Sequence, residues 1–186
     1  MPFPDLTATP GGAASNTYAT AGEADAVASY RVGGSAWTAL TANQKAQALV
    51  TATRQIDALE QTIGFKGERA TDTQALEWPR TGTEYASTVL PAPLVSATIE
   101  LAISYTPAFA AGATVDVLNP AGNGNLKRKK TDVLEKEYFA PSAEAFESDA
   151  SAALAGFPPI VQRLLAALVR IPAVAGWGSS LVYRAS

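Results

Sequence analysis

A run of apolar residues at helical spacing, preceded by a capping signal, most constrains how this chain can fold. Thr41-Ala42-Asn43-Gln44 has the form of a capping box, whose hydroxyl and amide side chains satisfy free N–H groups at a helix start. Apolar and small residues then recur at helical spacing, namely Ala46, Leu49, Val50, Thr53, Ile56, Leu59 and Ile63. The pattern predicts an amphipathic helix that is closed by Gly64.

Other segments also carry helical patterns. Residues 21–32 precede Gly33-Gly34 and predict a helix that ends there. Residues 94–105 are apolar almost all round, which predicts a helix in the centre of a bundle or under a neighbouring subunit, ended by Pro107 and Gly112. Pro158-Pro159 opens a last predicted helix with an apolar stripe over residues 160–169, and Pro172 ends it.

Between and beyond these helices the sequence predicts irregular structure and one hairpin. Residues 65–93 are expected to form a long connection. A basic run followed by an acidic, β-prone run predicts a hairpin near 126–139 that turns at Thr131-Asp132. We therefore expect a mainly α fold: a small helical bundle over 21–171 with one β-hairpin, and extended N- and C-terminal arms at 1–20 and 172–186.

Composition excludes most catalytic chemistry. The chain has no histidine and no cysteine, so histidine-assisted serine or cysteine catalysis and thiolate metal sites are absent. Its acidic residues form no metal-binding motif, and we expect no enzyme activity, cofactor or metal. A net charge of −3 does not predict nucleic-acid binding by bulk electrostatics. No apolar run approaches the ~18–20 residues of a membrane span, and no secretory signal is evident, so we expect cytoplasmic synthesis and no membrane partner.

Two short motifs then follow one another in a specific order. The predicted central helix carries Thr53-Arg54-Gln55-Ile56-Asp57-Ala58-Leu59, and the connection after it carries Gln74-Ala75-Leu76-Glu77-Trp78-Pro79-Arg80-Thr81-Gly82. This order resembles a family of phage proteins labelled DnaT-like single-stranded DNA-binding proteins. The resemblance extends over about Thr17 to Arg170. Its structural signature comprises Arg54, Asp57, Trp78, Pro79 and Arg80.

The resemblance implies a structural role. Proteins of this kind are placed among head-to-tail adaptors, or head completion proteins, of tailed bacteriophages. The implied function is a dodecameric ring in the neck of the virion that links the portal protein to a tail or stopper protein around the DNA channel. The alternative is a single-stranded DNA-binding replication protein, as the family label says. A decoration or stopper protein of the same virion is a third reading.

The basic run and the tryptophan motif each have more than one interpretation. Lys127, Arg128, Lys129 and Lys130 could contact packaged DNA in a channel, dock on an acidic portal surface, or form a solvated hairpin edge. Trp78-Pro79-Arg80 could be a contact between subunits. We favour a structural role, in which these side chains hold the loop on the protein: Trp78 lies in the core and Arg80 pairs with Asp57 or Glu77.

The C-terminal segment offers candidate docking residues. Leu164, Leu165 and Leu168 lie on the apolar stripe of the last helix, which is most simply core packing but also suits docking on another chain. Trp177 and Tyr183 follow in the predicted tail. They could fill a pocket on a partner or pack locally.

Overall fold

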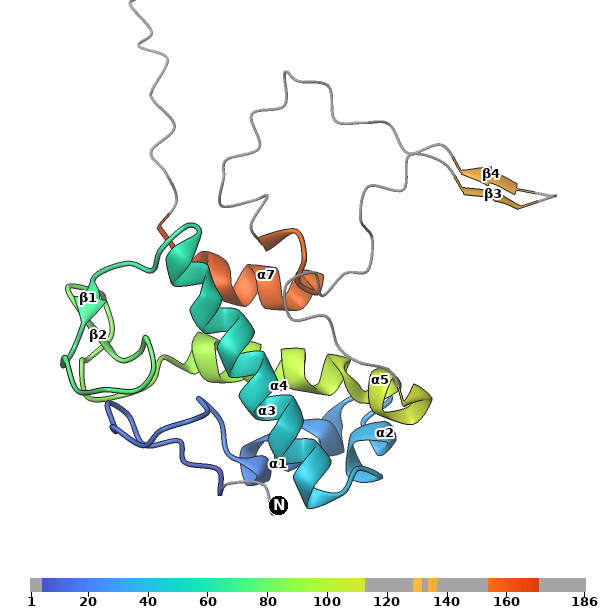
Figure 1. The fold of residues 1–186 in the computed structure, drawn as a ribbon, viewed down its shortest axis with the longest axis horizontal. Helices are drawn as coiled ribbons and strands as arrows, with labels where there is room; N and C mark the ends of the chain where they lie inside the picture. The colour runs from blue at the N-terminus through green and yellow to red at the C-terminus, as the bar shows by residue number, and fades with distance from the viewer. Residues whose placement is uncertain (1–4, 113–128, 132–133, 137–153, 171–186) are drawn as a thin grey trace, which may run out of the picture.

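Helix α3, Ala42–Asp57, crosses the middle of a helical bundle and is continued by the 3₁₀ helix η1, Ala58–Gln61 (Figure 1). Thr41 accepts a hydrogen bond from the backbone N–H of Gln44, and the Gln44 side chain accepts one from Thr41. The predicted capping box and central helix are thereby confirmed. The computed structural model describes residues 5–112, 129–131, 134–136 and 154–170.

The remaining helices surround α3, with α7 at one end of the bundle and α1 and α2 at the other (Figure 1). Their bounds are α1 Ala21–Tyr30, α2 Ser35–Thr38, α4 Ala92–Ser104, α5 Thr106–Ala111 and α7 Pro159–Ala166. The mainly α prediction is confirmed. The short α2 was not predicted, and Pro107 does not end the helical segment but lies in the first turn of α5, where its missing N–H has no helical partner to lose.

Helix α4 lies at the centre of the packing. It contacts both α3 and α7, and its buried side chains include Leu94, Leu101 and Ala102, each fully enclosed. Of the two predicted positions for this apolar helix, the centre of the bundle is the one found. The stretch Ala92–Ala111 is long and apolar enough to cross a membrane by length and composition, contrary to the sequence-based expectation, and half of it is buried within the protein.

The described part of the N-terminal segment lies on the bundle rather than extending from it. Tyr18 is 1% exposed and Thr17 is fully buried. The backbone N–H of Tyr18 donates to the Thr53 hydroxyl on α3 at 3.3 Å. Burial of these side chains makes residues 15–19 part of the core, so the prediction of an extended arm over 1–20 is wrong for this stretch. The predicted tail at 172–186 lies outside the described residues.

Two antiparallel strand pairs complete the described fold. Strands β1, Glu68–Arg69, and β2, Arg80–Thr81, pair within the connection that was predicted to be irregular. Gly67 permits this close approach, because its φ is +72° and a Cβ there would lie 2.0 Å from the Thr81 carbonyl oxygen. Strands β3, Lys129–Thr131, and β4, Leu134–Lys136, form the predicted hairpin, whose register pairs Lys130 with Glu135.

A first prediction concerns the cap of α3. Replacement of Thr41 by alanine removes the acceptor for the Gln44 N–H and should lower the free energy of unfolding by about 1 kcal/mol. Urea unfolding followed by circular dichroism measures this loss. Thr41→Ser keeps the hydroxyl and should retain most of the stability; an equal loss in both variants would show that the cap does not stabilise the helix.

Candidate nucleic-acid interface

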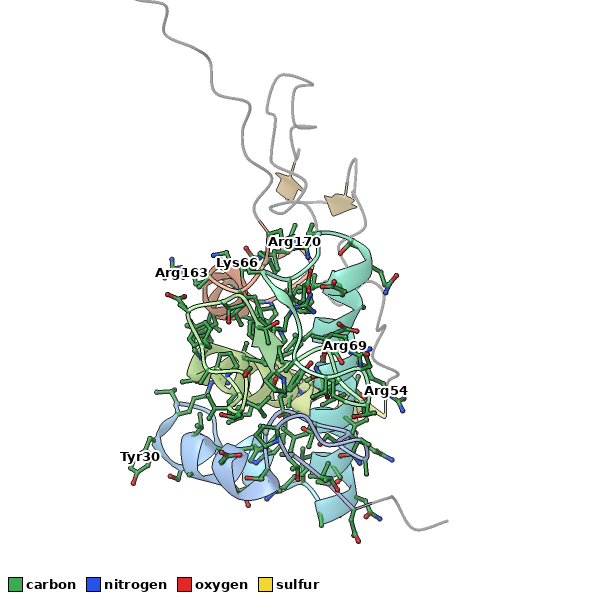
Figure 2. The ribbon with its side chains drawn as sticks, turned by 90° about the vertical axis from the view of Figure 1, so that its left-hand side faces the viewer. Tyr30, Arg54, Lys66, Arg69, Arg163 and Arg170 are labelled. Atoms are coloured by element: carbon green, nitrogen blue, oxygen red, sulfur yellow. The ribbon has the colours of Figure 1, made fainter. Side chains whose placement is uncertain are left out.

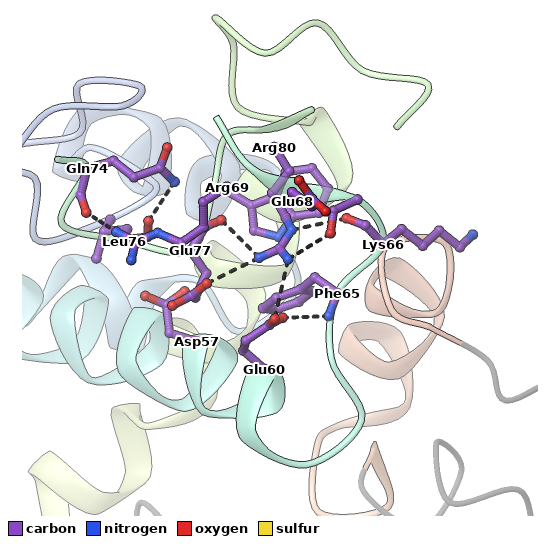
Figure 3. A network of polar contacts seen from close by, with 12 residues as sticks. Asp57, Glu60, Phe65, Lys66, Glu68, Arg69, Gln74, Leu76, Glu77 and Arg80 are labelled. Carbon is purple, nitrogen blue, oxygen red and sulfur yellow. Dashed lines mark hydrogen bonds and ion pairs between the residues drawn. The ribbon is translucent and has the colours of Figure 1, made fainter. Parts of the chain in front are cut away.

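Arg80 holds the loop that carries Trp78 and Pro79 against the C-terminal end of the central helix (Figure 3). Its side chain is only 3% exposed and forms ion pairs with Glu60 at 3.3 Å and Glu77 at 3.1 Å. The guanidinium also donates to the backbone carbonyls of Lys66 and Gly67. Buried arginines need such complete pairing. Trp78 is 2% exposed. This agrees with the prediction that Trp78 lies in the core and holds the loop in place, and not with an exposed contact between subunits.

Asp57 is not the partner of Arg80. Its carboxylate accepts a hydrogen bond from the Tyr18 hydroxyl, which in turn accepts one from the Trp78 backbone N–H at 3.1 Å. Burial raises the pKa of Asp57 to about 7, the nearby Glu77 charge adds to the rise, and the Tyr18 hydrogen bond opposes it. Arg54, one turn earlier, is exposed. The two motif residues of α3 therefore have different surroundings.

A short backbone bridge at the α7 end of the bundle sets the direction of two basic side chains. Phe65 pairs with Val169 in an antiparallel bridge, and both side chains are fully buried. The Lys66 N–H donates to the Leu168 carbonyl and the Arg170 N–H to the Gly64 carbonyl, each at 2.9 Å. Successive side chains of extended backbone point to opposite sides. Because Phe65 and Val169 point inward, the neighbouring Lys66 and Arg170 are exposed at the surface.

Backbone carbonyls hold these cations without neutralising them. The Lys66 ammonium donates to the Ala167 carbonyl at 2.7 Å, and the Arg170 guanidinium donates to the carbonyls of Phe65 at 2.7 Å and Gly67 at 3.2 Å. Neither forms an ion pair among the described residues. A carbonyl orients a cation but leaves its full charge available to an anion. We call the exposed set Lys66, Arg163 and Arg170 the basic end.

Figure 2 places the basic end at the α7 end of the molecule, away from Arg54 and Arg69 and opposite the exposed Tyr30. Arg163 lies in the last turn of α7. Arg54 and Arg69 are also exposed and form no ion pair among the described side chains, although Arg69 donates to the Gln74 carbonyl and its charge opposes the rise in the pKa of Asp57. Arg31, Lys45 and Arg80 are all ion-paired. Cationic side chains that lack carboxylates are the groups that can exchange counterions for phosphates.

The predicted docking residues of α7 are buried within the protein. Leu165 and Leu168 are fully enclosed, and Leu164 is partly buried against the same core. Leu165 and Leu168 therefore serve as core residues, and the docking assignment is wrong for them because no surface remains for a partner to contact. Lys127, Arg128, Trp177 and Tyr183 lie outside the described residues, and for Lys129 and Lys130 only the β3 backbone is described. Their proposed roles remain predictions.

Sequence reasoning missed the basic end. Lys66 and Arg170 are isolated basic residues in the sequence, and only the pairing of Phe65 with Val169 brings them together. The local signal was the position of Arg163 and Arg170 off the apolar stripe of the last predicted helix. Among the described residues no group of acidic side chains is arranged to hold a metal ion.

Comparison with known proteins gives a single assignment. The family described as putative DnaT-like ssDNA binding protein matches residues 6–184, which is nearly the whole chain. No curated protein matches. No solved structure matches either.

Proposed function

This chain belongs to the family of putative DnaT-like ssDNA binding proteins, and we propose on that premise that it binds single-stranded DNA through the basic end. The observation that carries the proposal is the group of exposed cations Lys66, Arg163 and Arg170, which lack carboxylate partners among the described side chains. Arginine and lysine side chains in this state bind phosphate oxygens and release counterions from the strand.

The mode of binding follows from how the cations are held. Lys66 and Arg170 are already oriented by backbone carbonyls, so a phosphate does not have to break an ion pair to reach them. Contacts to phosphate carry no sequence information, so this part of the binding is independent of sequence. The chain carries a net charge of −3, so attraction is confined to the local patch and should weaken steeply with salt.

The predicted basic run supports the same function. Lys127, Arg128, Lys129 and Lys130 would add phosphate contacts to those of the basic end if a strand reached both. Their neutralisation to glutamine should then reduce the salt dependence further. The two sets are separate in sequence and can be tested independently.

Paired variants test the basic end. K66Q/R163Q removes two exposed cations of the patch, while R54Q/R69Q removes two exposed cations that lie away from it. Both changes lower the net charge by the same amount. Each phosphate contact contributes ~0.7 to the slope of log affinity for oligo(dT) against log salt. We therefore expect K66Q/R163Q to reduce the magnitude of this slope by about 1.4, and R54Q/R69Q to leave it nearly unchanged. Equal effects would indicate attraction by net charge alone and would contradict binding at this patch.

The adaptor role implied by the phage resemblance is a second candidate, and one observation favours it. Tyr30 is 93% exposed and lies at the end of the bundle opposite the basic end (Figure 2), and Val32, two residues further along the chain, is 100% exposed. Exposed aromatic and aliphatic side chains close together suit burial against another protein. Under this proposal the chain forms a ring with itself and contacts portal and tail or stopper proteins in the virion neck.

The assembly proposal has its own test. Y30S/V32S should change the melting temperature little, because both side chains are exposed, yet should abolish ring formation or attachment to the portal. Analytical ultracentrifugation with and without the portal protein measures this. V89S removes another exposed aliphatic side chain and serves as the control. Unchanged assembly in Y30S/V32S would remove the observation on which the adaptor role depends.

A further inference from the structure

A small cleft lies beside the basic end, between the loop that follows β2 and the C-terminal end of α7. Its volume is about 230 Å³, and its lining includes Lys66, Trp78, Glu84, Tyr85, Ala167 and Leu168. Sites for drug-sized ligands occupy roughly 300–1,000 Å³. The cleft therefore suits a single planar ring better than a larger ligand.

Aromatic and aliphatic side chains form about half of its lining, which also includes Gly82 and Thr83. The rings of Trp78 and Tyr85 meet edge to face, with centroids 6.3 Å apart and an interplanar angle of 76°. The exposed Ala167, directly after α7, adds a small apolar side chain, and the fully buried Leu168 lies behind it. Such a wall offers favourable contact to the face or edge of a planar ring.

The charges around the cleft favour a base inside it and the attached phosphate outside it. Glu84 lines the cleft and is exposed, so its carboxylate repels an anion that enters. Lys66 lines the same cleft and also belongs to the basic end, where Arg170 hydrogen-bonds to the adjoining backbone. A neutral base inside the cleft avoids repulsion by Glu84, and the phosphate attached to it, outside the cleft, can bind Lys66.

Trp78 adds a polar feature to this wall. Its indole Nε1–H is buried and has no hydrogen-bond acceptor in the described part of the chain. A buried donor without a partner costs free energy, but this nitrogen has no accessible surface, so the base contact proposed below does not depend on it.

We propose that this cleft holds one unstacked nucleobase of a single strand whose phosphates bind the basic end. The inference rests on the proposed single-stranded DNA binding and extends it by naming where a base is held. It requires an unpaired strand, because a base in a duplex is stacked and paired and cannot enter.

The test fills the cleft without changing any charge. Ala167 is exposed and lines the cleft, whereas the neighbouring Ala166 is also exposed but does not line it. A167F should weaken binding of oligo(dT) about tenfold through loss of the base contact, and A166F should bind like wild type. The salt dependence should be the same in all three proteins, because the phosphate contacts remain.

A strand without bases separates this inference from the proposed function. Wild type should bind oligo(dT) more tightly than an abasic strand of equal length, and A167F should bind the two alike. Tyr85→Ser, which removes a partly exposed ring from the wall, should reproduce A167F and covers the case that A167F is unstable. Equal binding of both strands by wild type would overturn the base subsite and leave phosphate binding intact. Absence of any binding would overturn both.

Discussion

Replacement of Arg80 by methionine is expected to lower the free energy of unfolding by about 3–5 kcal/mol, the cost of removing one member of a buried ion-pair group. Methionine fills much of the space but leaves the Glu60 and Glu77 carboxylates without their cation and removes one of the two donors to the Gly67 carbonyl. A chain of this length should then melt about 10 °C lower. Calorimetry and urea unfolding measure the two quantities.

A more exposed ion pair provides the control for Arg80. Lys45, whose side chain is 15% exposed, pairs with Asp25, whose side chain is 47% exposed, so K45M should cost only about 1 kcal/mol. The triple variant R80M/E60Q/E77Q removes the orphaned charges and should recover much of the loss. A cost for R80M as small as that for K45M would mean that the loop is held by packing of Trp78 alone.

Stability should fall as pH rises from about 4 to about 7, because of Asp57. Its pKa is about 7 in the folded protein, against an ordinary value of 3.8 for an aspartate side chain. Between these values the folded state binds a proton that the unfolded state has released, so raising the pH favours unfolding. A pKa difference of this size corresponds to a loss of about 2–4 kcal/mol in the free energy of unfolding, allowing for partial exposure of the side chain. The chain has no histidine to obscure this window.

The variant D57N isolates this contribution. An asparagine oxygen can still accept from the Tyr18 hydroxyl but carries no charge at any pH. We expect D57N to lose little stability between about pH 5 and pH 8, and to be more stable than wild type at the upper end. Urea unfolding at the two pH values gives the comparison. Parallel pH profiles for the two proteins would show that Asp57 is ionised normally.

Local sequence patterns were sufficient to predict the long helices but not the segments that connect them. The stripe from Ala46 to Ile63 and the capping residues predicted α3 because helical spacing and capping are local properties. The short α2 has no such stripe, and Pro107 looks the same in sequence whether it ends one helix or begins the next. The β1–β2 pair depends on contacts between residues 68–69 and 80–81 that no periodicity marks.

The same division applies to the functional residues. Burial of Trp78 and pairing of Arg80 could be foreseen, because a large aromatic in a long loop gains by packing and a nearby acid can satisfy an arginine. Tyr18 could not be foreseen as the partner of Asp57, since the two are joined only by the fold. Likewise, the basic end exists because Phe65 pairs with Val169, far along the chain, which leaves Lys66 and Arg170 side by side at the surface.

Titration of the wild-type protein with a labelled oligo(dT) over a range of salt concentrations tests the central claim most directly. Phosphate contacts by Lys66, Arg163 and Arg170 each contribute ~0.7, so log affinity should fall against log salt with a slope of about −2 or steeper. A base in the cleft further predicts that the single strand is preferred over a duplex of the same length. Absence of binding at low salt, or equal binding of single strand and duplex with a slope near zero, would contradict the account.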